Sequence, residues 1–422
     1  MRKKIVILLS LVIMMGVIFT GCNKKETSSA DTQDEKVTLG IWWASQDEFK
    51  APLLEAIREF EEANPQIKIE PEWMPNFDYY DKYKIALTGD QAPDIVKIDH
   101  VFVQSLGYNG QVFDLAEFGA DKIKDQFIQS TWDANMYKEH VYALPFDANT
   151  LALMYNKDIL DKAGVMPPTT LEQLIASSQA VSELGEEGVY GYTIPFDPGK
   201  SGFLSFQFTS WIARNGGSIL SDDWSKATLN SPEVIQALKQ VKSLIDTKAA
   251  PANAFMENEF YAGKIGMLEM GPWHVPTITS PDAPANFGIV PVVSLKEGVD
   301  TYAPLGLYSL AIAKQSKHPE EAYKFIEFLA THEKMQIAYS KTTNLMPTLK
   351  EAYKDEFYDN DVWKIFITQL EKTVSRPGSP AWPLIDEAIS DAIQEVLTDT
   401  KSPEDALKNA EEKINKELEK LQ

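Results

Sequence analysis

The residue types that most often carry out chemistry are scarce or scattered in this chain of 422 residues. It has one cysteine, Cys22, and five histidines, at positions 100, 140, 274, 318 and 332. One thiol cannot form an intramolecular disulfide or a thiolate cluster, and histidines so far apart leave little for a metal site. The zinc-peptidase motif HExxH and the nucleotide-loop motifs GxxxxGK[ST] and GxGxxG do not occur. We therefore expect no metal and no cofactor.

Carboxylates are the abundant reactive groups. Asp and Glu number 62 against 40 Lys and Arg, which gives a formal net charge of -22. This excess argues against a nucleic-acid-binding protein and against a polybasic lipid-surface protein, since both need basic faces. Two acids beside a sugar carry out glycoside hydrolysis, so a secreted glycan-active enzyme is one function to consider. With 62 acids no local pair stands out, and composition alone supports that alternative.

The first 22 residues have the pattern of a targeting segment. A basic stretch at 2–4 precedes an apolar run at 5–19, which is shorter than the roughly 20 residues of a bilayer span and predicts a signal peptide over 1–21. The run ends in FTGC, which resembles the lipobox of bacterial lipoproteins except at Phe19, where Leu, Val or Ile is usual. The resemblance implies that Cys22 is lipidated and becomes the mature N-terminus. The alternative is a secretory signal with an incidental cysteine.

The segment that follows is polar. Residues 23–36 read NKKETSSADTQDEK, in which Ala30 is the only apolar side chain. Such a segment cannot bury enough apolar surface to become ordered. We therefore expect residues 22–36 to be a flexible tether between a lipid anchor and a folded body.

Strand and helix patterns alternate beyond the tether. Segments rich in β-formers at 37–43, 67–73 and 93–99 flank amphipathic helix patterns at 47–63 and 77–87. This alternation predicts an α/β fold with a mostly parallel sheet, whose ligands bind at the carboxyl ends of the strands. The second half repeats the style without a tandem repeat, with strands expected from 150, at 188–196 and 263–273, and helices at 170–181, 203–217, 230–248 and across most of 379–422.

Five segments together carry a family resemblance: TGDQAPDIVKID, YALPFDANTLALMYNKDIL, LNSPEVIQALK, GKIGMLEMGPW and KHPEEAYKFIEFLA. In this order, and behind the lipobox-like signal, they resemble the extracellular solute-binding proteins of sugar ABC importers, the family that contains maltose-binding protein. The similarity runs from about residue 36 to about residue 400.

The resemblance implies a two-lobed periplasmic-binding-protein fold of type II, in which each lobe is a mostly parallel sheet flanked by helices. Three hinge crossovers are expected, near 146–150, 304–307 and 344–348. The N-lobe would then comprise 37–146 plus 305–346, and the C-lobe 147–304 plus 347–422. Such lobes close around a ligand by hinge motion.

A sugar presents hydroxyl groups and apolar C–H faces, so its site needs polar side chains and aromatic platforms. Trp43 ends the first predicted strand, and Trp273 follows a glycine turn at a position that matches a cleft-lining tryptophan of the family. Trp211 matches an aromatic stretch of the family's cleft, Tyr308 follows the second hinge, and Trp382 lies where the family has an aromatic contact. Each tryptophan could instead be a core residue.

Polar candidates lie at the same expected strand ends and hinges. Gln46 could bind hydroxyl groups or be an exposed loop residue. Asp99 and His100 end the third strand, although Asp99 could simply cap the helix that follows. Asp147 and Asn149 lie at the first hinge, where their alternative role is to form a turn.

Two charged residues complete the expected ligand site. Glu269 shares a face with Trp273 if the strand stays regular. Arg376 could contact a ligand carboxylate, but it could equally bridge an acid of the protein itself. The remaining candidates are acidic or uncharged, which favours a neutral ligand.

The resemblance implies a binding protein rather than an enzyme. The expected function is to capture a neutral mono- or oligosaccharide outside the cytoplasm and to deliver it to ABC permease subunits in the membrane. We expect a monomer that is held at the cell membrane by the lipid on Cys22, with no nucleic-acid partner and no catalytic residue. The alternatives are the same fold with another small solute, or the glycan-active enzyme.

Overall fold

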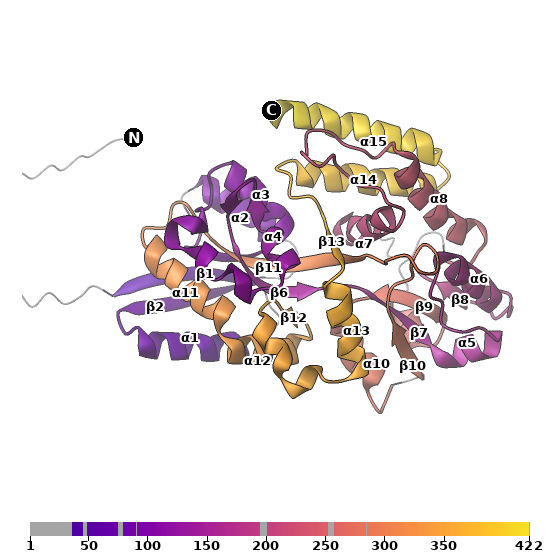
Figure 1. Ribbon diagram of the computed structural model, residues 1–422, viewed down its shortest axis with the longest axis horizontal. Coiled ribbons are helices and arrows are strands. Elements are labelled where there is room, and N and C mark those ends of the chain that lie inside the picture. Colours follow the sequence, from indigo (N-terminus) through magenta and orange to yellow (C-terminus); the bar gives the residue numbers. More distant parts are fainter. Residues whose placement is uncertain are drawn as a thin grey trace, which may run out of the picture. The chain divides into compact units, whose positions relative to one another are not determined.

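Two β-sheets organise the protein in a computed structural model that describes residues 36–44, 49–74, 79–89, 91–194, 201–251, 257–283 and 285–421 (Figure 1). The predicted signal peptide, Cys22 and nearly all of the tether lie outside these residues, as does Gln46. Among the described residues, no helix is long and apolar enough to cross a membrane.

The first sheet has seven strands, in the order β12-β6-β11-β3-β1-β2 with β13 beside β11. Its strands are β1 (Val37–Ala44), β2 (Ile67–Met74), β3 (Ile95–Asp99), β6 (Leu144–Asn149), β11 (Ala303–Ile312), β12 (Met346–Pro347) and β13 (Thr373–Ser375). We call this sheet and the helices around it the first lobe: α1 (Ala51–Ala63), α2 (Tyr79–Thr88), α3 (His100–Tyr108), α4 (Gln129–Asp133), α11 (Pro319–Thr331) and α12 (Glu333–Thr343). A short hairpin of β4 (Met136–Tyr137) and β5 (His140–Val141) also belongs to it.

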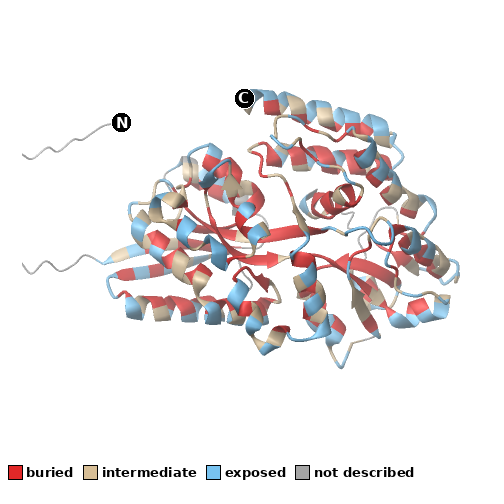
Figure 2. Ribbon diagram, in the orientation of Figure 1, coloured by how far each residue is buried: buried red, intermediate tan, exposed pale blue. Residues whose placement is uncertain are grey.

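The second sheet has four strands in the order β10-β7-β9-β8, which are β7 (Ala152–Asn156), β8 (Tyr190–Tyr192), β9 (Ile265–Met270) and β10 (Phe287–Val290). With its helices it forms the second lobe: α5 (Lys157–Ala163), α6 (Leu171–Ser182), α7 (Ser201–Arg214), α8 (Pro232–Asp246), α9 (Glu257–Tyr261), α10 (Val275–Thr279), α13 (Asp361–Leu370), α14 (Trp382–Leu397) and α15 (Pro403–Leu418). The strands of both sheets are largely buried, whereas the helices alternate buried and exposed positions (Figure 2).

The chain changes sheets near the expected hinges. Strand β6 pairs within the first sheet up to Asn149, and β7 begins the second sheet at Ala152. The chain returns between β10 and β11, and leaves the first sheet again after Pro347. The segment 373–375 then runs parallel to the first residues of β11 before α14 and α15 complete the second lobe.

The expectation of mostly parallel sheets is wrong, because both sheets are mixed. Strand β1 is parallel to β2 and β3, but β11 is antiparallel to β3 and β6, and β7 is antiparallel to β9 and β10. Parallel neighbours need a crossover connection, usually a helix, and β1 to β3 have such connections. Strand β11 instead returns from the second lobe, so it runs opposite to β3 and to β6, whereas β6 runs in the same direction as β3.

Local sequence explains where several helices begin. Helix α1 begins at Ala51, later than the expected residue 47, with Pro52 in its first turn, where a missing N–H costs nothing. Its buried residues include Leu53, Ile57 and Phe60, at helical spacing. Helix α8 begins after Ser231, whose side chain accepts a hydrogen bond from the Val234 N–H, and it ends at Asp246 rather than at 248.

Candidate ligand-binding site

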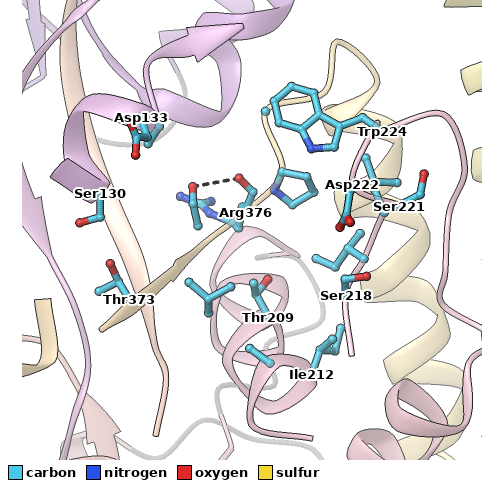
Figure 3. Close-up of a pocket in the computed structure, with 18 of the residues that line it drawn as sticks. Ser130, Asp133, Thr209, Ile212, Ser218, Ser221, Asp222, Trp224, Thr373 and Arg376 are labelled. Carbon is cyan, nitrogen blue, oxygen red and sulfur yellow. Dashed lines mark hydrogen bonds between the residues drawn. The ribbon is translucent and has the colours of Figure 1, made fainter. Parts of the chain in front are cut away.

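A cavity of about 450 Å³ lies between segments of the two lobes (Figure 3). Helices α3 and α4 contribute from the first lobe, and α7 and the loop 217–224 contribute from the second lobe. The segment 373–378 completes the wall. The sequence predicted a ligand site between two lobes, but most of the residues that line this cavity are not those that the sequence indicated.

The wall combines hydroxyl groups, carboxylates and one indole ring. Its polar and aromatic members include Ser130, Asp133, Thr209, Ser218, Ser221, Asp222, Trp224, Thr373 and Arg376. Asp133 and Asp222 are exposed and come from opposite lobes. Hydroxyl and carboxylate oxygens can bond to ligand hydroxyl groups, and an indole face can cover apolar C–H groups. Such a wall suits a small polyhydroxylated ligand.

Arg376 is the sequence-predicted residue that lines this cavity among those that the structure describes. Its Nη2 donates to both carboxylate oxygens of Asp99, at 3.1 and 3.0 Å. The guanidinium also lies over the rings of Phe206 and Trp382, with its Cζ 5.2 and 5.8 Å from the ring centroids. Of the two roles considered for Arg376, the structure therefore shows the bridge to an acid of the protein.

Asp99 holds several elements together at the end of β3. Its carboxylate accepts from the Val101 N–H and so caps α3, which was the alternative role considered for it. Burial alone would raise the pKa of Asp99, but the Arg376 guanidinium, His100 and the Val101 N–H together hold this pKa well below its usual range. Asp99 is therefore an anion that neutralises the arginine of the cavity wall.

His100 is fully buried beside Asp99. Its Nδ1 lies 3.3 Å from the Leu307 carbonyl oxygen and 3.0 Å from Asp99, and its Nε2 lies 3.2 Å from the Ser375 hydroxyl oxygen. The imidazole thus joins α3 to β11 and to the segment 373–378. It positions the wall rather than facing the cavity.

Another ion pair, between Lys97 and Asp147, involves the residue two positions before Asp99 on β3. Lys97 Nζ is 2.5 Å from Asp147, both side chains are under 5% exposed, and Lys97 also donates to the Tyr339 hydroxyl at 2.9 Å. Burial raises the pKa of Asp147 against the opposing effect of Lys97. The ammonium lies 5.1 Å from the ring centroid of Trp43, which is 0% exposed and packs edge-on against Phe146. Trp43 is therefore a core residue, as its alternative role expects. Asp147 is an ion-pair partner within β6 rather than the turn residue considered as its alternative.

The carboxylate of Glu269 is likewise paired with other residues of the second lobe. It is 0% exposed, and Arg214 pairs with both of its oxygens at 2.9 and 3.2 Å. Gln207 donates to one of these oxygens at 3.2 Å. Glu269 lies on the regular strand β9, and its side chain points into the second lobe, where these partners compensate its buried charge. It is therefore not a member of the cavity wall.

The other predicted residues divide into buried and partly exposed. Trp211 and Trp382 are 2% and 1% exposed and belong to the core of the second lobe, as the packing alternative for tryptophan expects. Asn149, Trp273 and Tyr308 are partly exposed and lie outside the described cavity wall. Their role as ligand contacts stays a prediction, as does that of Gln46.

Sequence reasoning missed most of the wall. The segment 221–225 reads SDDWS, which places Trp224 in a polar stretch with two aspartates and two serines. This local composition, an indole among carboxylates and hydroxyl groups, was the available signal. No pattern marks Ser130, Thr209 or Thr373, because each looks like an ordinary polar position. Among the described residues, no group of three or more His, Cys, Asp or Glu could hold a metal ion.

Residues 43–336, well over half of the chain, match the family described as bacterial extracellular solute-binding protein. The chain belongs to this family. One relative of this solute-binding protein is the maltotriose-binding protein of Pyrococcus abyssi, which is 26% identical over 84% of this chain and 77% of the relative. Another is the maltodextrin-binding protein of Bacillus subtilis, which is 24% identical over 100% of this chain and 99% of the relative.

Solved structures agree with the fold. The cyclic α-maltosyl-1,6-maltose binding protein of Arthrobacter globiformis is 26% identical, with a TM-score of 0.80 over 91% of this solute-binding protein and 99% of that chain. An ABC substrate-binding protein of Listeria monocytogenes, solved with cycloalternan, is 25% identical, with a TM-score of 0.77 over 91% and 99%. The expected family and the two-lobed α/β fold are confirmed, and the relatives named here are binding proteins rather than enzymes.

Proposed function

We propose that this protein captures a neutral sugar, an oligosaccharide in particular, in the cavity between its lobes and delivers it to the permease of an ABC importer. The cavity wall carries the proposal, because hydroxyl groups, carboxylates and an indole ring converge there from both lobes. Its volume of about 450 Å³ lies in the range of small-molecule sites, roughly 300–1,000 Å³. Relatives named for maltotriose and maltodextrin support a sugar of more than one ring.

The charges of the wall favour a neutral ligand. The Asp99 carboxylate already neutralises the Arg376 guanidinium, and Asp133 and Asp222 add negative charge. An anionic ligand would need cations or helix N-termini directed at it. Sugar phosphates and uronates should therefore bind much more weakly than neutral sugars.

The setting of this function is also part of the proposal. The mature chain would begin at a lipidated Cys22 and act as a monomer at the outer face of the cell membrane. Residues 22–36 would be the tether. The N-lobe would comprise 37–146 plus 305–346 and the C-lobe 147–304 plus 347–422, apart from the ends of β6, β11 and β12 and the short β13, which pair within the first sheet. The family match over 43–336 supports the extracytoplasmic setting.

A thermal-shift and calorimetric panel of malto-, galacto- and xylo-oligosaccharides tests the proposal. A sugar present at 100 times its Kd should add about 2.7 kcal/mol to stability, and it should be recovered with no new reducing ends. Asp222→Ala should weaken binding, whereas Asp282→Ala, an exposed acid outside the described wall, should not. New reducing ends would favour the enzyme alternative, and the absence of any binding would contradict the proposal.

A further inference from the structure

The backbone of Trp224 has a conformation that tryptophan rarely adopts. Its φ is 57°, in the left-handed region that favours glycine, and its side chain is only partly buried. Bulky residues with positive φ are outliers, and such a strained conformation persists only where the surrounding structure imposes it. Such strain concentrates at binding sites, and Trp224 lines the cavity.

Hydrogen bonds within the turn at 221–226 stabilise the conformation of Trp224. The Trp224 N–H donates to the Ser221 carbonyl at 2.8 Å, and the Ser221 N–H donates to the Lys226 carbonyl at 2.8 Å. The carboxylate of Asp223 accepts from the hydroxyl groups of Ser221 and Ser225, each at 2.7 Å. These bonds hold the indole in place before any ligand arrives.

The same turn is also fixed to the body of the second lobe. The N–H of Ala227 donates to Asn415 Oδ1 on α15 at 2.8 Å, and Leu220 forms a β-bridge with Ala227 across the base of the turn. The indole is therefore displayed on a rigid support. Rigid aromatic side chains bind with little loss of conformational entropy.

The neighbour of the Trp224 ring comes from the other lobe. Tyr137, in the β4–β5 hairpin, stacks on Trp224 with ring centroids 5.9 Å apart and planes 22° apart. Tyr108, at the end of α3, meets the Tyr137 ring edge-on at 6.0 Å. Tyr137 lies outside the described cavity wall, so it contacts the cavity only through Trp224.

We propose that Trp224 is a platform for a sugar ring and that Tyr137 is its positioning residue, which holds the platform from the opposite lobe. This inference rests on the proposed function and extends it. Because the stack joins the lobes at the cavity wall, it should hold them together around a bound sugar until it breaks. Tyr137 should therefore slow ligand release without touching the ligand.

The kinetic test uses stopped-flow fluorescence with the tightest-binding oligosaccharide of the panel. An aromatic pair contributes about 0.5–1.5 kcal/mol, so Tyr137→Ala should raise the dissociation rate roughly 2- to 12-fold and leave the association rate nearly unchanged. Tyr137→Phe keeps the ring and should restore the wild-type rate. Trp224→Ala should weaken binding at least about tenfold. Tyr302→Ala, which removes an exposed ring elsewhere, is the matched control.

A wild-type dissociation rate in Tyr137→Ala, or a wild-type affinity in Trp224→Ala, would overturn the inference. A ligand-free test separates this failure from failure of the proposed function. In a double-mutant cycle on urea unfolding, the Tyr137→Ala and Trp224→Ala changes should be coupled by a factor of roughly 2 to 12 in the unfolding constant. Additive effects in that cycle would show that the stack does not join the lobes, whatever the ligand.

Discussion

Arg376 and Asp99 are 277 positions apart in sequence, yet one guanidinium nitrogen of Arg376 lies 3.1 and 3.0 Å from the two carboxylate oxygens of Asp99. The pair joins the end of β3 to the wall segment 373–378. It also cancels the positive charge that the cavity would otherwise present. The charge of the cavity wall therefore depends on a contact between two segments that are remote in the chain.

The first prediction concerns ligand charge. Asp99→Asn keeps the shape of the side chain but leaves the Arg376 guanidinium uncompensated. Uronates should then gain at least about tenfold in affinity relative to the matching neutral sugar, roughly 1.4 kcal/mol, as measured by calorimetry. Asp282→Asn serves as the control. An unchanged ratio of affinities would show that Arg376 does not face the ligand.

The second prediction concerns the buried pair of Arg214 and Glu269. Removing either charge leaves its partner buried and unpaired, so Arg214→Met or Glu269→Leu should each lower the free energy of unfolding by ~3–5 kcal/mol. Replacing both together, by Met and Leu, should cost far less than the sum of the two single changes. Urea unfolding of the four proteins measures the coupling. Additive losses would mean that the two side chains do not act as a pair.

The third prediction concerns pH. Burial lowers the pKa of His274 from 6.5 to about 4, and Tyr261 and Glu257 lie beside its Nδ1. As the pH falls, His274 of the unfolded chain is therefore protonated near pH 6.5, whereas His274 of the folded protein is protonated only near pH 4. Between these two values the unfolded state binds more protons, so the free energy of unfolding decreases as the pH falls.

The expected size of this loss is roughly 3 kcal/mol between pH 7 and pH 4. The measurement is urea unfolding at several pH values, for the wild type and for His274→Gln. The variant should lose that part of the pH dependence. Parallel pH profiles for the two proteins would show that His274 titrates alike in both states.

The fourth prediction concerns Trp273, which remains a candidate sugar platform. It is partly exposed, and its ring lies over Gly271, where an added Cβ would fall 2.0 Å from the ring. Trp273→Ala should cost ~2 kcal/mol or more of binding, at least roughly thirtyfold in affinity, with little change in melting temperature. Gly271→Ala should displace the ring and weaken binding in the same direction. A large loss of stability with unchanged affinity would instead assign Trp273 to the core.

The fifth prediction concerns the anchor. Cys22→Ser should release the protein into the medium, because the lipid chains of a lipoprotein would no longer be attached. Fractionation of membranes and medium after expression measures this. A serine variant that stays on the membrane would contradict the proposed anchor.

Local patterns in the sequence predicted most of the elements. The apolar spacing of Leu53, Ile57 and Phe60 indicated α1, and the β-rich run at 37–43 indicated β1. The order of five motifs indicated the family, which the match over 43–336 confirms. These features are set by residues within a turn or two of one another, so they can be identified without knowing the fold.

The candidate site could not be predicted in the same way. Asp99, Asp147 and Glu269 were plausible sugar contacts by type, but tertiary packing brings each of them against a basic residue.

Spacing along a strand says which residues share a face, but it does not say which face is covered. Only the folded chain brings β3 to the segment 373–378, and only there do Trp43 and Trp382 become core while Trp224 reaches the cavity. The sequence by itself determined the elements, the family and the supply of acids and indole rings. The tertiary structure decided which acids are paired with a basic residue, which indole rings are buried and which side chains line the cavity. Charge pairing and burial depend on contacts between segments that are remote in the chain.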